Sequence, residues 1–132
     1  AQLAGDPGLD QDALRALAKR HEVGFHTLAH DRLVSLADDQ LSAALAVGRD
    51  ELEAAVGRSV TTIAYPHGAA DERVAAAARS AGYAIGFAGG NRAASAEDGR
   101  LLVPRLDPWH RSLGTFAITL ATAVIEAAGP PR

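Results

Sequence analysis

The sequence predicts an α/β domain in which parallel strands are joined by crossover helices. Helical and strand patterns alternate along the chain, and this alternation is typical of parallel sheets. The predicted strands are largely apolar, which favours cover on both faces of the sheet. Four strands are too few to close a barrel by themselves, so either the sheet is open or part of the architecture is missing.

Composition limits the classes of function. The chain has 132 residues, 48% hydrophobic and 22% charged, which predicts one globular domain over 1–132. The net charge is −3 and no lysine or arginine cluster stands out, so nucleic acid is a poor candidate partner. The absence of cysteine excludes disulfides and thiolate chemistry. We expect no membrane span, and no signal-peptide pattern begins the sequence, which leaves the compartment open.

The first half of the sequence predicts two helices and one strand. Asp10 is a suitable N-cap for a helix over 11–20, whose apolar residues recur at helical spacing. A short apolar strand follows at 22–25. Asp38 and Asp39 then favour the start of one long helix that ends at Gly57.

The second half predicts three further strands. Residues 60–65 are rich in β-branched side chains. Residues 83–87 alternate large and small, so the small face of that strand is expected to pack closely against a neighbour. The other predicted elements are a helix from Asp71 to Gly82, a strand at 101–103 ended by Pro104, and a helix capped by Ser112 that ends near Ala128.

Polar segments follow three of the strands, where functional residues of parallel α/β folds gather. The first holds His26 and His30, which share a face if the backbone between them makes one helical turn. Neutral imidazole is a common ligand of zinc. The pair is a weak signal by spacing alone, and two surface histidines in a polar loop are the alternative interpretation.

The other two segments are 65–68 and 104–110. Proline and glycine in the first also fit a plain turn. In the second, Trp109 fits a core or rim aromatic as well as a sugar-stacking platform. Arg105 and Asp107 fit a surface ion pair, which contributes little to stability.

Several of these motifs resemble those of one enzyme family. The run from His26 to His30 resembles the His-(Ser/Thr)-x-x-His metal motif of the polysaccharide deacetylases, family 4 carbohydrate esterases with a NodB homology domain. His21-Glu-Val-Gly24 fits the strand that precedes this motif, with Arg20 in place of its first glycine. Tyr65-Pro-His-Gly-Ala-Ala-Asp71 and Val103-Pro-Arg105 resemble later motifs of a variant branch. The resemblance covers 10–107 and corresponds to the C-terminal two-thirds of a deacetylase domain.

The resemblance implies a fold and an activity. The fold would be a partial, distorted and incomplete β/α barrel of the NodB type. The activity would be hydrolysis of N-acetyl groups on an acetylated amino-sugar polysaccharide, with His26 and His30 as ligands of a divalent metal, zinc being the first choice. The family also favours an extracytoplasmic or cell-surface location.

The resemblance further assigns individual roles. The backbone N–H of His67 would bind the oxyanion. In the family an arginine orients a catalytic carboxylate; Ala64 stands at its position here, and we infer that Arg105 supplies that charge instead. The family's usual closing Leu-x-His, source of the general acid, is not evident, and His110 would be its stand-in. Substrate contacts are assigned to three residues, Tyr65, Pro66 and Trp109.

The sequence departs from the family in one respect that matters for catalysis. The family motif Thr-Phe-Asp-Asp-Gly, which supplies a general base and a third metal ligand, is absent, and Asp38-Asp39 lies at a helix start. We expect the corresponding strands upstream of Ala1, and activity of this chain depends on that motif being supplied. Two alternatives follow: a non-catalytic carbohydrate- or partner-binding remnant of the fold, and a domain that oligomerises through its open sheet edge.

Overall fold

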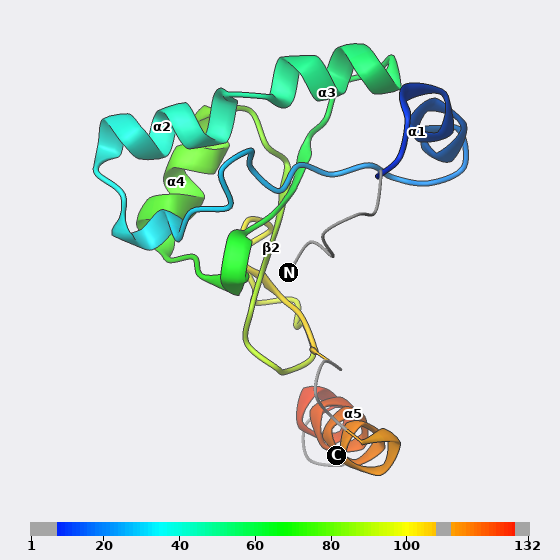
Figure 1. The fold of residues 1–132 in the computed structure, drawn as a ribbon. Coiled ribbons are helices and arrows are strands. Elements are labelled where there is room, and N and C mark those ends of the chain that lie inside the picture. The colour runs from blue at the N-terminus through cyan, green and yellow to red at the C-terminus, as the bar shows by residue number, and fades with distance from the viewer. Residues whose placement is uncertain (1–7, 108–111, 129–132) are drawn as a thin grey trace.

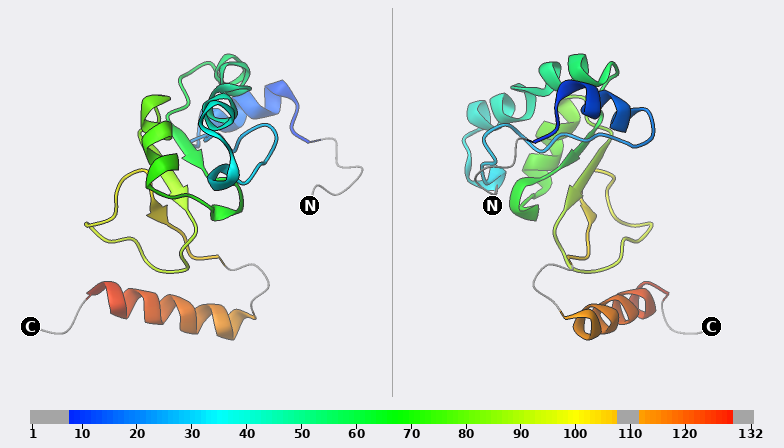
Figure 2. Two further views of the ribbon diagram at one scale, coloured as in Figure 1. Left: turned by 90° about the vertical axis from the view of Figure 1, so that its left-hand side faces the viewer. Right: turned by 45° about the vertical axis from the view of Figure 1, so that its right-hand side comes forward.

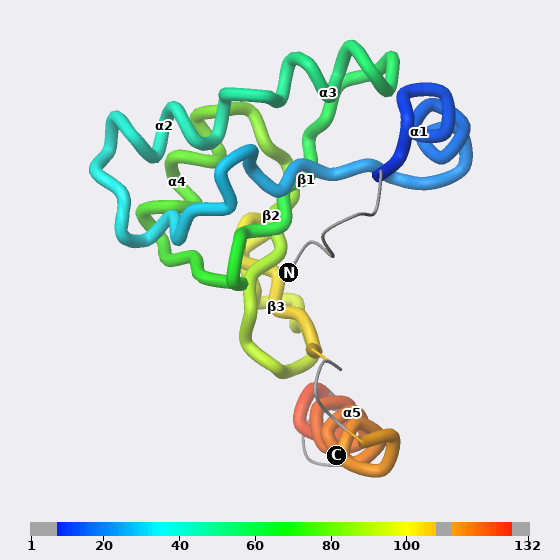
Figure 3. Tube along the Cα trace, viewed as in Figure 1, coloured from blue at the N-terminus to red at the C-terminus, as the bar shows by residue number. Residues whose placement is uncertain are grey.

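The computed structural model describes residues 8–107 and 112–128, and within them three parallel strands form one sheet. The strand order in the sheet is β1, β2, β3, and Figure 3 labels all three strands. β1 and β2 pair with Ile63 opposite Gly86, and β2 and β3 pair with Phe87 opposite Val103. The strands are β1 (Thr62–Ala64), β2 (Ile85–Ala88) and β3 (Val103–Pro104).

The strand predicted at 22–25 is reduced to a single bridged residue. Phe25 forms an isolated parallel bridge to Ile63 on the free side of β1. Its N–H donates to Thr62 O at 2.8 Å, and its carbonyl accepts from the Ala64 N–H at 2.9 Å. The ladder stops there because the His26 side chain takes the next acceptor, with Nδ1 2.6 Å from Ala64 O. A continuing parallel strand needs that carbonyl for a backbone N–H.

The helices begin where their caps predict. Asp10 accepts from the Ala13 N–H at 2.7 Å, and Asp71 accepts from the Val74 N–H at 2.9 Å. Ser112 accepts from the Thr115 N–H at 3.1 Å. The helices are α1 (Gln11–Ala18), α2 (Asp38–Ala46), α3 (Arg49–Val56), α4 (Glu72–Ser80) and α5 (Leu113–Ala128), with short 3₁₀ turns η1 (Leu33–Ser35) and η2 (Pro66–Gly68).

The prediction of one long helix to Gly57 was wrong, because two helices occupy that stretch. Val47 leaves the helical region and Gly48 has a φ of +85°, so α2 and α3 lie end to end (Figure 1). Glycine adopts this conformation at little cost. The break lets α2 pack on α4 while α3 packs on α1.

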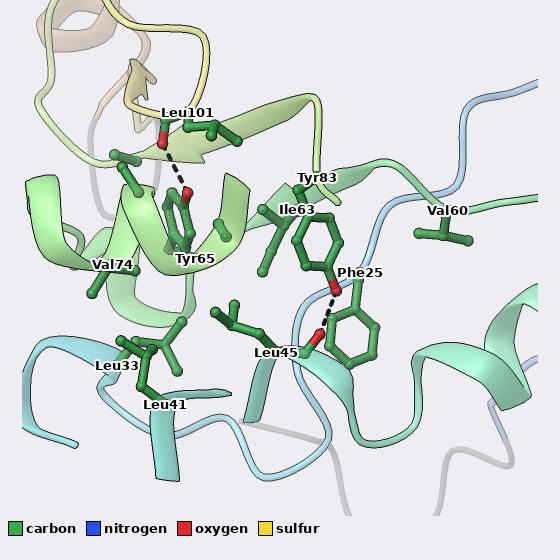
Figure 4. Close-up of a cluster of buried hydrophobic side chains, with 13 residues drawn as sticks. Phe25, Leu33, Leu41, Leu45, Val60, Ile63, Tyr65, Val74, Tyr83 and Leu101 are labelled. Carbon is green, nitrogen blue, oxygen red and sulfur yellow. Dashed lines mark hydrogen bonds between the residues drawn. The ribbon is translucent and has the colours of Figure 1, made fainter. Parts of the chain in front are cut away.

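One hydrophobic core lies between the sheet and these helices, and Figure 4 shows its larger side chains. Two buried tyrosines form hydrogen bonds between segments of the core: the Tyr65 hydroxyl donates to Leu101 O and the Tyr83 hydroxyl donates to Leu45 O, each at 2.8 Å. Gly86 of β2 packs directly on the Tyr65 hydroxyl, because a Cβ there would overlap it. The small face predicted for this strand therefore meets a close neighbour.

Helix α5 stands apart from the sheet and the other helices in every view (Figure 2). Several of its large apolar side chains are exposed, with Leu113 at 85% and Ile118 and Ile125 each at 70%. Within the described residues no helix is both long and apolar enough to cross a membrane. The described strands form an open parallel sheet in a mixed α/β fold, and the incomplete β/α barrel implied by the family resemblance stays a prediction.

Candidate metal and substrate site

The two histidines that follow Phe25 lie close together. The ring centroids of His26 and His30 are 4.9 Å apart, and the rings meet edge to face at 66°. The backbone between them is not helical, so the two rings meet without the helical turn that would have placed them on one face. Thr27 and His30 have positive φ values of 59° and 57°, and Thr27 Oγ1 accepts from the His30 N–H at 3.1 Å. This tight turn brings the rings together.

The hydrogen bond of His26 fixes which of its nitrogens is available. Because Ala64 O only accepts, Nδ1 of His26 must carry the proton. In the neutral ring, Nε2 then has a free lone pair. His26 is an exposed residue that lines a cavity. A backbone carbonyl on the other ring nitrogen is the usual support of a metal-binding histidine.

A third histidine joins the pair from the turn after β1. The His67 ring centroid is 4.6 Å from that of His30, and His67 Nε2 donates to His30 O at 3.3 Å. Local desolvation, together with the neighbouring His26 and His67, lowers the pKa of His30 from its usual 6.5. The lowered pKa keeps this imidazole neutral to a lower pH, which favours binding of a cation over protonation.

A cavity of about 680 Å³ opens beside the histidines at the carboxyl ends of the strands. Arg105, after β3, lies in its wall and donates from Nε to Ala88 O at 3.4 Å. Asn91, after β2, also lines it, and its N–H donates to Arg105 O at 3.0 Å. The lining residues are His26, Tyr65, His67, Gly68, Gly89, Gly90, Asn91, Arg105, Leu106 and Asp107.

The structure thus brings most of the predicted site residues to one place. His26, His67 and Arg105 line the cavity, and His30 contacts two of the histidine rings. Tyr65 and Pro66 are both buried, although Tyr65 borders the cavity, and their assignment as substrate-binding residues stays a prediction. The predictions for two residues, Trp109 and His110, lie outside the described residues.

Sequence reasoning missed Asn91. The available signal was Gly89-Gly90 directly after a predicted strand, because paired glycines there allow a backbone to approach a ligand closely. The Asn91 backbone has a φ of 57°, a conformation in which asparagine is enriched.

The donor set fits part of a metal site. The imidazoles of His26, which Ala64 O holds, and of the adjacent His30 are suitable nitrogen ligands. Among the described residues, however, no three side chains of the His, Cys, Asp and Glu types are already arranged to hold a metal ion.

Comparison with known proteins identifies the family to which the chain is similar. A family profile described as polysaccharide deacetylase matches residues 4–86. The search of curated proteins gave no match.

Solved structures share the fold. The deacetylase PplD of Streptococcus pyogenes, solved in complex with acetate, is 22% identical with a TM-score of 0.69 over 74% of this chain and 44% of its own. A polysaccharide deacetylase from Bacillus cereus is 19% identical with a TM-score of 0.65 over 84% of this chain and 36% of its own. A family 4 carbohydrate esterase from Streptomyces lividans, also with acetate, is 14% identical with a TM-score of 0.55 over 86% of this chain and 65% of its own. The chain therefore spans less than half the length of the first two.

Proposed function

Since the chain belongs to the polysaccharide deacetylase family, we propose that it is a metal-dependent deacetylase domain that hydrolyses N-acetyl groups on amino-sugar polysaccharides. The observation that carries this proposal is the cluster of His26, His30 and His67 beside a 680 Å³ cavity at the carboxyl ends of the parallel strands. His26 and His30 would hold a divalent cation, with zinc as the first choice. When bound, such an ion polarises an acyl carbonyl and lowers the pKa of water.

Groups of this chain would orient the metal ligand His26 and would supply a hydrogen-bond donor and a positive charge to the reaction. Ala64 O holds the His26 ring in one tautomer. The His67 N–H donates to no other described residue, which leaves it able to bind an oxyanion as the family resemblance implies. The Arg105 guanidinium places a positive charge in the cavity wall, suited to orienting a carboxylate.

The proposal extends to the complete fold, the missing catalytic groups and the cellular location. We infer that the open sheet is part of a distorted β/α barrel of the NodB type. A carboxylate ligand and a general base would have to join the two imidazoles, either from a further segment or from a second copy. The family relationship favours an extracytoplasmic or cell-surface site of action.

The test combines metal binding with turnover. We expect the chain to bind about one Zn²⁺ in metal-free buffer. We expect it to release acetate from chitooligosaccharide once the further segment or second copy that supplies the carboxylate and the general base is present. The double variant His26→Ala, His30→Ala should bind Zn²⁺ more than about 100-fold more weakly and release no acetate, since two ligands are lost. His21→Ala is the matched control, because His21 is exposed and does not line the cavity. Equal Zn²⁺ affinity in the double variant would contradict the proposal.

A second function is favoured because, in the described part of the chain, no three side chains of ligating type are arranged to hold a metal ion. In that case the cavity binds the polysaccharide without cleaving it. Chitooligosaccharide binding by calorimetry, with no acetate release at saturating Zn²⁺, would favour this non-catalytic remnant.

A further inference from the structure

We propose that His67 is a positioning residue for the metal-binding pair, acting through His30. The inference rests on the proposed function, because it assumes that His30 is a ligand. It assigns a role to the His67 side chain, whereas the oxyanion role concerns only its backbone N–H.

The position of His67 is fixed by its backbone. Pro66 begins the turn η2, and His67 then adopts a left-handed conformation with φ 58° and ψ 8°. The Gly68 carbonyl accepts from the Gly89 N–H at 2.8 Å, which attaches the turn to the end of β2. The approach is close, since a Cβ at Gly68 would lie 2.7 Å from Gly89 N. His67 therefore projects from a turn with little freedom to move.

His30 depends on a neighbour for its orientation. The His26 ring has a hydrogen bond to Ala64 O, but the ring nitrogens of His30 have no hydrogen-bond partner among the described residues. The His30 ring contacts only two other rings in the described part of the chain, those of His26 and His67.

His67 restrains His30 in two ways. Its Nε2–H donates to the His30 carbonyl at 3.3 Å, which holds the left-handed end of the 26–30 turn. Its ring also meets the His30 ring edge to face, with centroids 4.6 Å apart and planes at 65°. Removal of a group that orients a metal ligand typically weakens metal binding 10–100-fold.

The experiment measures Zn²⁺ affinity by competition with a chromophoric chelator, for the wild type and three variants. His67→Ala removes both contacts, and we expect about a 10-fold or greater loss of affinity. His67→Gln keeps an N–H donor near the position of Nε2, and His67→Phe keeps a ring without a donor. At least one of these two should recover most of the lost affinity, and which one identifies the contact that matters. All three keep a Cβ, so the backbone cost of a positive φ is the same.

A second readout separates positioning from general destabilisation. The d–d absorption bands of bound Co²⁺ should shift in His67→Ala and return in the recovering variant, while thermal unfolding of the metal-free chains stays alike. Wild-type Zn²⁺ affinity and unchanged Co²⁺ bands in all three variants would overturn the inference. So would equal losses in all three, because His67 would then be a ligand itself.

Failure of the proposed function gives a different result. If the wild type binds no Zn²⁺, the ring resonances of His30 in the metal-free chain still report the contact by NMR. Displacement of these resonances in His67→Ala would retain the positioning role without a metal. Unchanged His30 resonances would contradict the positioning role of His67, whether or not the proposed function is correct.

Discussion

Backbone strain is concentrated at the candidate site. Within the described residues, four non-glycine residues have positive φ: Thr27, His30, His67 and Asn91. All four belong to the histidine turns or line the cavity. Such conformations cost about 1–3 kcal/mol each and tend to mark functional sites. For Thr27 the cost is high, because its side chain is β-branched.

Sequence reasoning found the histidines but not the geometry that joins them. The spacing of His26 and His30 predicted that they meet, and they do, but through a left-handed turn. The contact of His30 with His67 joins residues that are 37 positions apart, so no local sequence pattern predicts it. The strand before the histidines ends because the His26 side chain, and not a backbone N–H, bonds to Ala64 O. The periodicity of apolar residues in the sequence gives no sign of such a replacement.

Both tyrosines make the fold sensitive to alkaline pH. Burial raises the pKa of Tyr65 to about 12 and that of Tyr83 to about 12. In the unfolded chain both ionise near pH 10, so the folded state binds more protons above that pH. Stability is fully present below pH 10 and falls as the pH rises toward 12. We expect a loss of about 1 kcal/mol per tyrosine at pH 11, measured by urea unfolding at pH 8 and pH 11.

Tyr65→Phe is the control for this pH dependence. At pH 8 it should cost about 1–3 kcal/mol, because the Leu101 carbonyl loses its buried donor. Between pH 8 and pH 11 the variant should lose only about half as much stability as the wild type. An unchanged alkaline loss in the variant would show that Tyr65 does not contribute.

At the scale of elements, local signals predicted the starts of helices better than their lengths. Asp10, Asp71 and Ser112 cap helices as expected, since a cap acts within one turn. The break at Gly48 was missed because the apolar stripe continues across it. What separates α2 from α3 is the packing of each on a different helix, which lies outside the local sequence.

Gly86 is the point where β2 meets the core tyrosine. A methyl group there would overlap the Tyr65 hydroxyl and lie 2.8 Å from Leu101 O, the two atoms that form the hydrogen bond. Gly86→Ala should therefore destabilise the chain by about 1–3 kcal/mol in urea unfolding. In a Tyr65→Phe background the cost should be smaller, because the overlapping oxygen is gone.

Gly99→Ala is the matched control for that substitution. An added Cβ at Gly99 meets nothing within 4 Å. Its effect should stay within about 0.5 kcal/mol. Equal costs at both positions would mean that the Gly86 effect reflects loss of a glycine and not crowding of Tyr65.

For the molecule as a whole, the alternation of elements predicted parallel strands and the edge at which the functional loops meet. The family resemblance implied a partial, incomplete β/α barrel; the described strands form an open sheet, and the barrel character stays a prediction. Sequence alone did not predict that α5 stands apart, because an apolar helix pattern indicates that a helix is covered but not by what.

The exposed surface of α5 has a consequence for assembly. Ile118 and Ile125 are each 70% exposed and lie seven residues apart, on one face of the helix. Glu126 is the one charged residue of α5, so little opposes association through this face. We expect the chain to self-associate at concentrations of tens of micromolar, measured by light scattering.

Ile118→Lys with Ile125→Lys should shift the chain toward monomer, because two charges would have to be buried. Leu9→Lys, at a 66% exposed position outside α5, should leave association unchanged. A strictly monomeric wild type, or an equal effect of Leu9→Lys, would exclude α5 as the contact.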